Sequence, residues 1–327
     1  MKSIESIAKL LHEFSLTPIL VDVGASGNPP LVWRPISKQS VYIGFDPDRR
    51  EMKDIAEGIF KRTVIVNKAV TDQADAEQIH FYLTRSPFCS STLRPNPAVL
   101  SDYVFAELFA VEREVDVPAT TLDQLLDELH FPHIDWLKLD TQGTDMLLIK
   151  SISENRFSRL LALDIEPGLM SYYIGENLFC ELHPYLVESG FWLSNMKVEG
   201  AARMRPETLQ SLGKLTKKWL RFEESLKRSP GWIEARYLRD LEHIHTHDQH
   251  LTLWVFALLD NQIGYALDIA SQFQKRFNDS LVAVQMQDIA MQFHTHRPAL
   301  SRRLLASIKQ LLRSSATTFL RRTWRSS

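Results

Sequence analysis

The chain has 327 residues, of which 44% are hydrophobic and 24% are charged, and its formal net charge is −2. These values are ordinary for a globular protein, and the length is sufficient for two domains. Two cysteines are too few for a disulfide framework, and no run of about 18 apolar residues predicts a membrane-spanning helix.

The first fourteen residues, MKSIESIAKLLHEF, predict an amphipathic helix. Acidic residues interrupt the apolar pattern and no small-residue cleavage site follows, so the stretch does not resemble a signal peptide. We therefore expect a cytoplasmic protein in which Cys89 and Cys180 are reduced thiols.

Short apolar runs alternate with helical patterns over the first two-thirds of the chain. Nearly continuous apolar runs are typical of strands that are buried on both faces of a parallel sheet. The expected strands are residues 19–23, 41–45, 63–67, 134–139 and 160–165, and two of the helical patterns cover residues 121–129 and 144–152. Strands that alternate with helices predict a doubly wound α/β fold.

The pattern changes after about Arg205. No strand is expected there, and apolar residues recur at helical spacing in residues 251–259, 265–273, 281–293 and 300–312. The charge changes sign as well: residues 1–206 hold 20 Lys and Arg against 29 Asp and Glu, whereas residues 207–327 hold 18 against 11. We predict a first domain of residues 1–206 and an all-helical C-terminal domain of residues 207–327.

A nucleotide-binding pattern begins at the first predicted strand. The run VDVGASG leads from a buried strand into a glycine-containing loop, and Asp46 ends the second strand 22 residues after Gly24. Ligands of doubly wound sheets lie beyond the carboxyl ends of the strands, where an acidic residue can accept hydrogen bonds from ribose hydroxyls. The candidate cofactor-binding residues are Asp22, Gly24, Ala25, Gly27 and Asp46. The alternative is that the glycines serve only a tight turn.

The loop favours a nucleotide without a pyrophosphate. It lacks the full G-x-G-x-x-G pattern, and Pro29 and Pro30 stand where the next helix should begin. A pyrophosphate is bound by a helix N-terminus, which S-adenosylmethionine does not need. The expected cofactor is therefore S-adenosyl-L-methionine rather than NAD.

The segments VDVGASG, YIGFDPD, SSTLRPN, DWLKLDTQGTDMLLIKS and ALDIEPG resemble, in this order and spacing, the FkbM family of methyltransferases over roughly residues 18–198. The most specific piece is the strand with Lys138 and Asp140, followed by Thr141, Gln142, Gly143 and Asp145. The resemblance implies a class I methyltransferase (Rossmann-like) fold, S-adenosylmethionine as donor, and O-methylation of acceptors that range from polyketides to surface sugars. Many relatives carry glutamate where Gln142 stands, so a role for that acid does not carry over.

Candidates for the chemistry lie at the ends of the fourth and fifth strands. Methyl transfer needs an acceptor oxygen held in line and a base to remove its proton. Asp140 is the preferred base, with a helix cap as its alternative role, and Glu166 and Asp164 are further candidates. Lys138 interrupts an apolar strand, so it either polarises a ligand or forms an ion pair with a nearby aspartate.

The remaining polar features have ordinary alternatives. Ser90, Ser91 and Thr92 either contact a ligand or stabilise a turn. His243 and His247 would share a face of a helix, but no partner ligands accompany them, so no metal site is expected.

The basic C-terminal residues either contact an anionic membrane surface weakly or face water while the apolar side packs on the protein. No nucleic-acid-binding module is recognised.

The expected function is O-methylation of a hydroxyl on a glycan or a small-molecule metabolite. Two rival hypotheses are a non-catalytic binding or scaffold protein on a methyltransferase fold, for which Gln142 and the Pro29–Pro30 loop are the motive, and an NAD(P)-linked enzyme.

Overall fold

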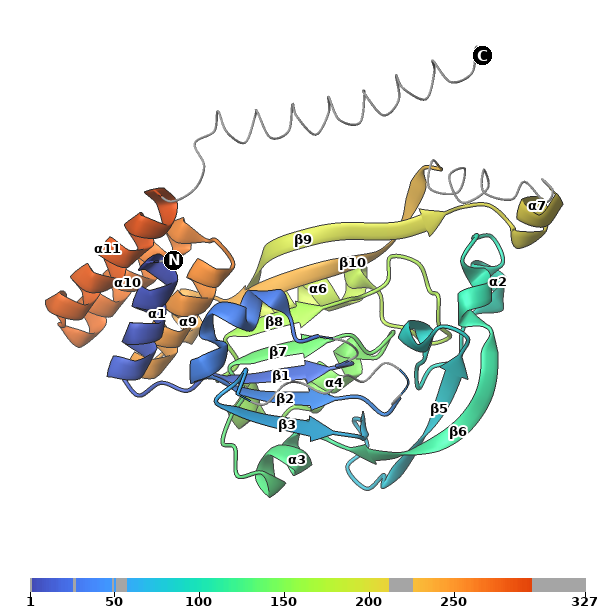
Figure 1. The fold of residues 1–327 in the computed structure, drawn as a ribbon, viewed down its shortest axis with the longest axis horizontal. Coiled ribbons are helices and arrows are strands. Elements are labelled where there is room, and N and C mark those ends of the chain that lie inside the picture. The colour runs from blue at the N-terminus through green and yellow to red at the C-terminus, as the bar shows by residue number, and fades with distance from the viewer. Residues whose placement is uncertain (1, 26–27, 49, 51–57, 212–225, 296–327) are drawn as a thin grey trace, which may run out of the picture.

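A computed structural model describes residues 2–25, 28–48, 50, 58–211 and 226–295. Its centre is a seven-stranded sheet with the order β3-β2-β1-β7-β8-β10-β9 (Figure 1). The strands are β1 (Ile19–Val23), β2 (Val41–Phe45), β3 (Arg62–Val66), β7 (Trp136–Leu139), β8 (Ala162–Ile165), β9 (Phe191–Ala202) and β10 (Arg228–Arg239). The strand β10 is antiparallel to both of its neighbours, and the other strands are parallel to one another.

The sheet is doubly wound, as the sequence predicts. From β1 the chain continues outward to β2 and β3, and then returns to place β7 on the other side of β1. The strand order therefore reverses between β1 and β7. In such folds the ligand lies beyond the carboxyl ends of the strands at this reversal.

Helices cover both faces of the sheet because successive strand residues point to opposite sides. Val21 packs with α3 (Leu122–Glu128), α4 (Asp145–Ser151) and α6 (Phe179–Glu188). Leu20 belongs to the opposite core, with α1 (Lys2–Glu13), the 3-10 helix η1 (Leu31–Gln39) and α9 (His247–Leu259). The amphipathic helix expected at the N-terminus is therefore part of the main structure.

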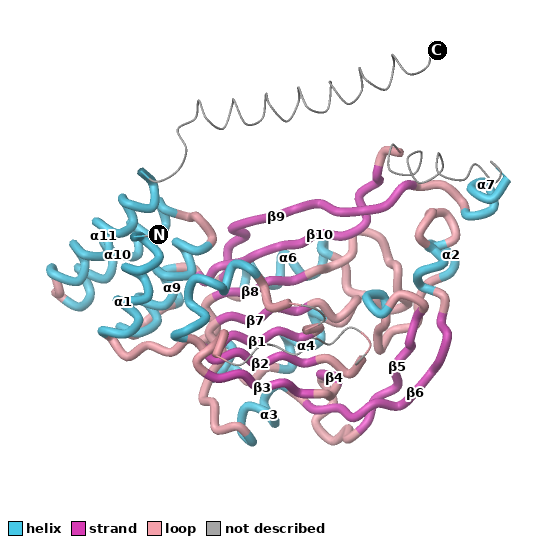
Figure 2. Tube along the Cα trace, in the orientation of Figure 1, coloured by secondary structure: helices cyan, strands magenta, loops and turns pink. Residues whose placement is uncertain are grey.

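A second, three-stranded sheet is inserted between β3 and β7. It consists of β4 (Ala69–Val70), β6 (Val111–Thr120) and β5 (Gln78–Thr84), in that order. Figure 2 shows β5 and β6 beside the carboxyl ends of the parallel strands. The loops of this insertion carry η2 (Pro87–Cys89), α2 (Pro97–Leu100) and η3 (Ala106–Phe109). Smaller helices elsewhere are α5 (Glu154–Phe157), α7 (Pro206–Ser211) and η4 (Leu241–His243).

The expectation that no strand follows Arg205 is wrong. The strand β10 lies between β8 and β9 in the main sheet, so residues 207–327 are not all helical. Along β10, Glu234 and Arg236 alternate with apolar residues only over residues 233–237, so the strand lacks the nearly continuous apolar run by which the expected strands were predicted. The predicted boundary at residue 206 thus precedes a strand of the main sheet.

The C-terminal helices expected from the sequence are present within the described residues. They are α9, α10 (Ile263–Phe277) and α11 (Ser280–Thr295), and the predicted helix at residues 300–312 lies outside those residues. A capping box between Thr246 and Gln249 begins α9, and α9 is buried between the sheet and α10. None of the described helices is long and apolar enough to span a membrane.

Candidate functional site

The glycine loop after β1 is held tightly between the ends of β2 and β7. Gly24 has a φ of +81°, and a Cβ on it would lie 2.2 Å from the carbonyl oxygen of Asp140. The N–H groups of Gly24 and Ala25 both donate to the carbonyl of Phe45, at 3.0 and 2.9 Å. Gly24 is thus required for close approach to the neighbouring backbone. Gly27 lies outside the described residues.

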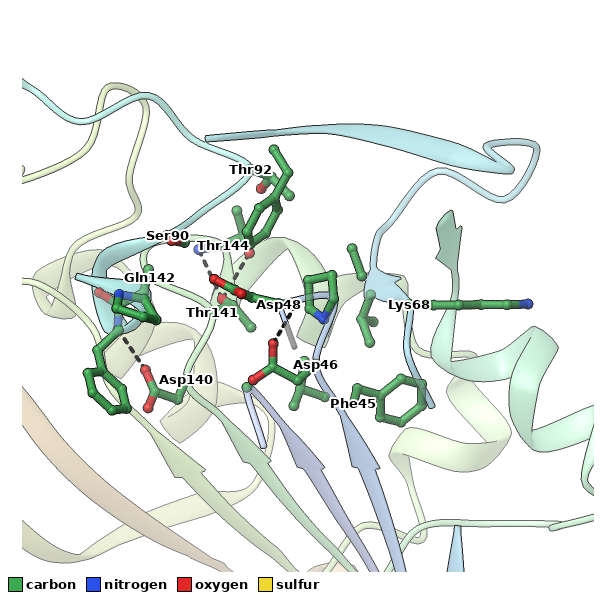
Figure 3. A pocket seen from close by; sticks show the side chains of 18 residues that line it. Phe45, Asp46, Asp48, Lys68, Ser90, Thr92, Asp140, Thr141, Gln142 and Thr144 are labelled. Atoms are coloured by element: carbon green, nitrogen blue, oxygen red, sulfur yellow. Dashed lines mark hydrogen bonds between the residues drawn. The ribbon is translucent and has the colours of Figure 1, made fainter. Parts of the chain in front are cut away.

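A cavity lies beyond the carboxyl ends of β1, β2 and β7, and we call it the first cavity. It has about 730 Å³ of empty space, including open solvent, and Gly24, Asp46 and Asp140 line it. Apolar walls come from Phe45, Val70, Phe81 and Phe88, among other residues. Figure 3 shows the carboxylates of Asp46 and Asp140 at the ends of their strands. The first cavity therefore occupies the position that the reversal of strand order predicts.

Asp46 is held in place by its own turn. Its Oδ1 accepts a hydrogen bond of 2.8 Å from the N–H of Asp48 (Figure 3), and its carbonyl accepts one of 2.6 Å from Asn67 Nδ2. Burial raises the pKa of the Asp46 carboxyl to about 6. Above that pH the carboxylate is an acceptor in the first cavity, with one oxygen bonded to its own turn.

Asp22, the candidate cofactor residue within β1, is not among the residues that line the first cavity, unlike Gly24 and Asp46. It is almost fully buried, and its two oxygens accept hydrogen bonds from Lys138 Nζ at 2.8 Å and from the Tyr42 hydroxyl at 3.0 Å. The pKa of Asp22 is nevertheless raised, because the effect of burial exceeds that of Lys138. The structure thus pairs Asp22 with Lys138, the ion-pair alternative that the sequence raised for this lysine.

Lys138 joins three parts of the site. Besides Asp22, its Nζ lies 3.4 Å from the carbonyl oxygen of Gly24 and 3.9 Å from Asp140 Oδ2. Asp22 and Asp140 raise the pKa of Lys138 above its ordinary value despite burial, so it is a cation at neutral pH. Its charge therefore stabilises two carboxylates and the glycine loop.

Asp140 and Glu166 form a carboxyl pair at the ends of β7 and β8. Burial is the largest cause that raises the pKa of Glu166 to about 10, and the charge and hydrogen bond of Asp140 add to it. Glu166 is thus the protonated member at neutral pH. Asp140 Oδ1 also accepts a hydrogen bond of 2.7 Å from Gln142 Nε2.

Comparison with known families agrees with this arrangement. The family model of the methyltransferase FkbM domain matches residues 35–201. The chain belongs to the FkbM methyltransferase family. No curated protein matches the chain. The match runs from within η1 to near the end of β9 and includes Asp46, Lys138, Asp140 and Glu166, so these four residues lie within the methyltransferase domain.

The sequence did not reveal how this methyltransferase fixes the loop after β7. Asp145 Oδ1 accepts from the Thr141 hydroxyl at 2.5 Å, and its Oδ2 accepts from the N–H of Glu166 at 3.0 Å. Asp145 thus connects the end of β7 to the end of β8. The sequence had offered Asp140 for a comparable structural role, as a helix cap. The place of Asp145 in the first turn of α4 was the available signal, since acidic residues there stabilise helix N-termini.

The loop with Ser90, Ser91 and Thr92 forms hydrogen bonds within the protein. Ser90 Oγ accepts from the N–H of Thr84 at 3.1 Å, and Ser91 Oγ donates to the carbonyl of Gln142 at 2.9 Å. Ser90 and Thr92 both line the first cavity. Ser91 therefore connects this loop to the loop after β7, whereas Ser90 and Thr92 stay candidates for ligand contact.

A second cavity adjoins the first, and charged side chains of the main sheet line it. It has about 1270 Å³ of empty space, including open solvent, and Asp22, Lys138, Asp164 and Glu166 line it. Asp140 and Phe88 line both cavities. A group bound in the first cavity and one bound in the second would therefore meet at Asp140.

The histidines around the start of α9 lie in different surroundings: His243 and His245 are exposed, His247 is half-buried and His250 is buried. His243 lies in η4, one element before α9, so it does not share a helix with His247. The ring of His247 packs against Phe14, Phe273 and Phe277, among other rings. Within the described part of the chain, no group of three or more His, Cys, Asp or Glu could hold a metal ion.

Proposed function

We propose that this methyltransferase binds S-adenosyl-L-methionine in the first cavity and methylates a hydroxyl group of a glycan or a small-molecule metabolite. The observation that carries the proposal is the position of Asp46 beside Gly24 and Asp140, around one cavity at the reversal of strand order. Asp46 would accept hydrogen bonds from the ribose hydroxyls, and the apolar walls would cover the adenine.

The shape of the loop favours a cofactor without a pyrophosphate. After β1 the next helical element is the 3-10 helix η1, which begins at Leu31 after Pro30 and carries Pro35 inside it. A pyrophosphate is typically bound by the free N–H groups of an α-helix N-terminus. The residues at this position therefore fit S-adenosylmethionine better than NAD.

The chain's own residues would supply positioning and a base. S-adenosylmethionine, when bound, supplies a methyl group that is already activated for displacement. Asp140 is placed to take the proton of the acceptor hydroxyl. The acceptor oxygen would bond to the methyl carbon as the carbon–sulfur bond breaks, with S-adenosylhomocysteine as the leaving group. Lys138 Nζ lies 3.9 Å from Asp140 Oδ2 and attracts that carboxylate, and the protonated Glu166 can donate a hydrogen bond.

A non-catalytic binding protein is the second candidate. It is favoured by Gln142, since an amide that stands where relatives carry an acid removes one ionisable group from the site. In this case the protein would bind the cofactor and never turn it over.

Calorimetry with S-adenosylmethionine, S-adenosylhomocysteine and NAD tests the proposal. We expect the first two ligands to bind and NAD not to bind. Transfer of labelled methyl groups to a panel of hydroxyl and amine acceptors then separates an O-methyltransferase from the binding protein. Tight binding of NAD without binding of the sulfonium cofactor would reject the proposal.

A further inference from the structure

One face of the main sheet changes character halfway along its strands. Near the amino ends of the parallel strands, Leu20, Trp136 and Leu238 (the last on the antiparallel β10) pack in the core together with residues of α9. Towards the carboxyl ends the same face opens into the second cavity. The floor of this cavity is therefore the sheet itself, and the side chains on the floor decide which molecule can lie there.

The inner row of the floor consists of matched charges. Asp22, Lys138, Asp164 and Arg236 stand directly opposite one another on β1, β7, β8 and β10. Arg236 binds Asp164 through Nε and Nη2, at 2.6 and 2.9 Å, and its Nη1 binds Asp260 at 2.9 Å. With Lys138 paired to Asp22, both cations of this row are engaged. The inner row therefore offers no free cation to an anionic ligand.

The outer row lies two positions beyond the inner row, towards the carboxyl ends of the parallel strands, and its charges are less balanced. It consists of Asp140, Glu166, Glu234 and Lys197, and Lys197 stands opposite Glu234 in the register of β9 and β10. Lys197 Nζ lies 3.3 Å from Glu234 Oε1 and is also paired with Glu199. Glu166 is protonated at neutral pH, because burial and Asp140 raise its pKa to about 10. The row thus combines hydrogen-bond donors and acceptors with a small negative charge.

The rest of the lining supplies a flat apolar group. Phe88 lines the cavity together with Pro30, and its side chain is 57% exposed. Phe88 lines the first cavity as well, so its ring lies where the two cavities meet. A polar floor combined with an aromatic ring suits a ligand that has hydroxyl groups on its edge and an apolar C–H face.

We propose that the second cavity binds the methyl acceptor as an uncharged, polyhydroxylated ring such as a neutral sugar, and that Glu234 and Lys197 determine this specificity. This inference rests on the proposed function and adds the acceptor class to it. A hydroxyl group can donate to Glu234 and accept from Lys197. A phosphate or carboxylate would be desolvated next to Asp140 and Glu234 while the cations stay engaged. An ammonium group would have to displace Lys197 from Glu234.

Saturation-transfer NMR on the full chain tests the acceptor class, with and without S-adenosylhomocysteine. The probes are a methyl glucopyranoside and its 6-carboxylate, 6-phosphate and 2-amino counterparts, which share one ring. We expect the neutral sugar to bind, and each charged counterpart to bind about tenfold more weakly or worse. Labelled methyl transfer from S-adenosylmethionine should follow the same order.

Two substitutions show whether the cavity sets this order. Glu234→Lys should weaken binding of the neutral sugar about tenfold and strengthen binding of the 6-carboxylate and 6-phosphate sugars. The matched control is Glu114→Lys on β6, which removes an exposed glutamate that pairs with His80. It should change neither the affinity for the neutral sugar nor the affinity for the anionic sugars.

The inference is overturned if no neutral sugar binds, if a charged counterpart binds as tightly as the neutral sugar, or if Glu234→Lys leaves the sugar affinities unchanged. Cofactor calorimetry on the same samples separates this from failure of the proposed function: normal cofactor affinity without sugar binding rejects the acceptor class alone.

Discussion

Gln142 connects Asp140 to Tyr173 through its two amide atoms. Its Nε2 donates to Asp140 Oδ1 at 2.7 Å, and its Oε1 accepts from the Tyr173 hydroxyl at 3.0 Å. Gln142 has a φ of +57°, in the left-handed region that few non-glycine residues adopt. The fold thus holds this side chain in a strained backbone position, where it orients the carboxylate that we propose as the base.

We predict that Gln142→Glu raises the pH at which methyl transfer begins and leaves cofactor affinity near normal. A glutamate has the same shape but adds a carboxyl group beside Asp140 and Glu166, and carboxyl groups that share a site resist being ionised together. The pH dependence of kcat measures the shift. Gln142→Asn, which shortens the side chain without adding charge, is the control and should lower kcat without moving the profile. An unchanged profile in Gln142→Glu would show that the amide does not position the base.

Asp140→Asn should lower kcat by about 10²–10⁴-fold, the usual contribution of a general base. Cofactor affinity should change far less, because Asp46 and the apolar walls remain in the first cavity. Glu166→Gln is the matched control, since it replaces an acid that is protonated at neutral pH with an uncharged amide. Single-turnover kinetics and calorimetry provide the two values. Near-normal turnover in Asp140→Asn would show that Asp140 is not the base.

Asp46→Ala should weaken cofactor binding about tenfold or more, because hydrogen bonds to a charged group contribute roughly 1.5–3 kcal/mol each. The wild-type protein should show the same loss at low pH. Burial raises the pKa of Asp46 to about 6, so affinity should be constant above that pH and fall as the carboxylate is protonated below it. Titrations from pH 5 to 8 (roughly the range in which such shifted groups titrate) measure this. If affinity is independent of pH and unchanged in Asp46→Ala, Asp46 does not contact the cofactor.

Lys138→Met should destabilise the fold by about 3–5 kcal/mol, since it leaves Asp22 as a buried charge without its ion-pair partner. Asp22→Asn in the same chain should restore much of this loss, because the amide carries no charge and can keep a hydrogen bond to Tyr42. Denaturant unfolding of both single variants and the double variant gives the coupling between the two residues. Additive losses would mean that Lys138 and Asp22 stabilise the protein independently.

The strands that carry the first cavity could be predicted because they are nearly continuous apolar runs, interrupted only by Asp22 in β1 and Lys138 in β7. All five residues of β1 and of β2 are buried, and the acid or glycine that ends each strand marks the functional edge. The strands β4, β5, β6, β9 and β10 were not predicted. Of these, β10 faces the second cavity with Glu234 and Arg236 and contains Pro230 and Gly231. The charged residues that shape the second cavity are thus the ones that interrupt the apolar pattern.

The candidate site itself could be predicted only as a set of residues, since pairing depends on register. Lys138 stands opposite both Asp22 and Asp164, and Arg236 is the residue that engages Asp164. A sequence without β10 in the sheet offers no reason to match Asp164 to an arginine 72 residues away. The roles of Asp145 and Gln142 likewise depend on how the loop after β7 closes.

The boundary predicted at residue 206 can be tested by truncation, and the position of β10 now leads us to expect that a fragment of residues 1–206 aggregates. The fragment would lack the strand that pairs with both β8 and β9. It would also lack α9, whose Phe256 ring lies 4.7 Å from that of Trp136. Large apolar surfaces exposed in this way promote association.

A fragment of residues 1–295 keeps β10 and the three C-terminal helices, and it should stay monomeric and bind the cofactor. Circular dichroism, size-exclusion chromatography and cofactor titration of both fragments decide the question. A monomeric 1–206 fragment with a cooperative thermal transition and normal cofactor affinity would establish the first domain as an independent folding unit.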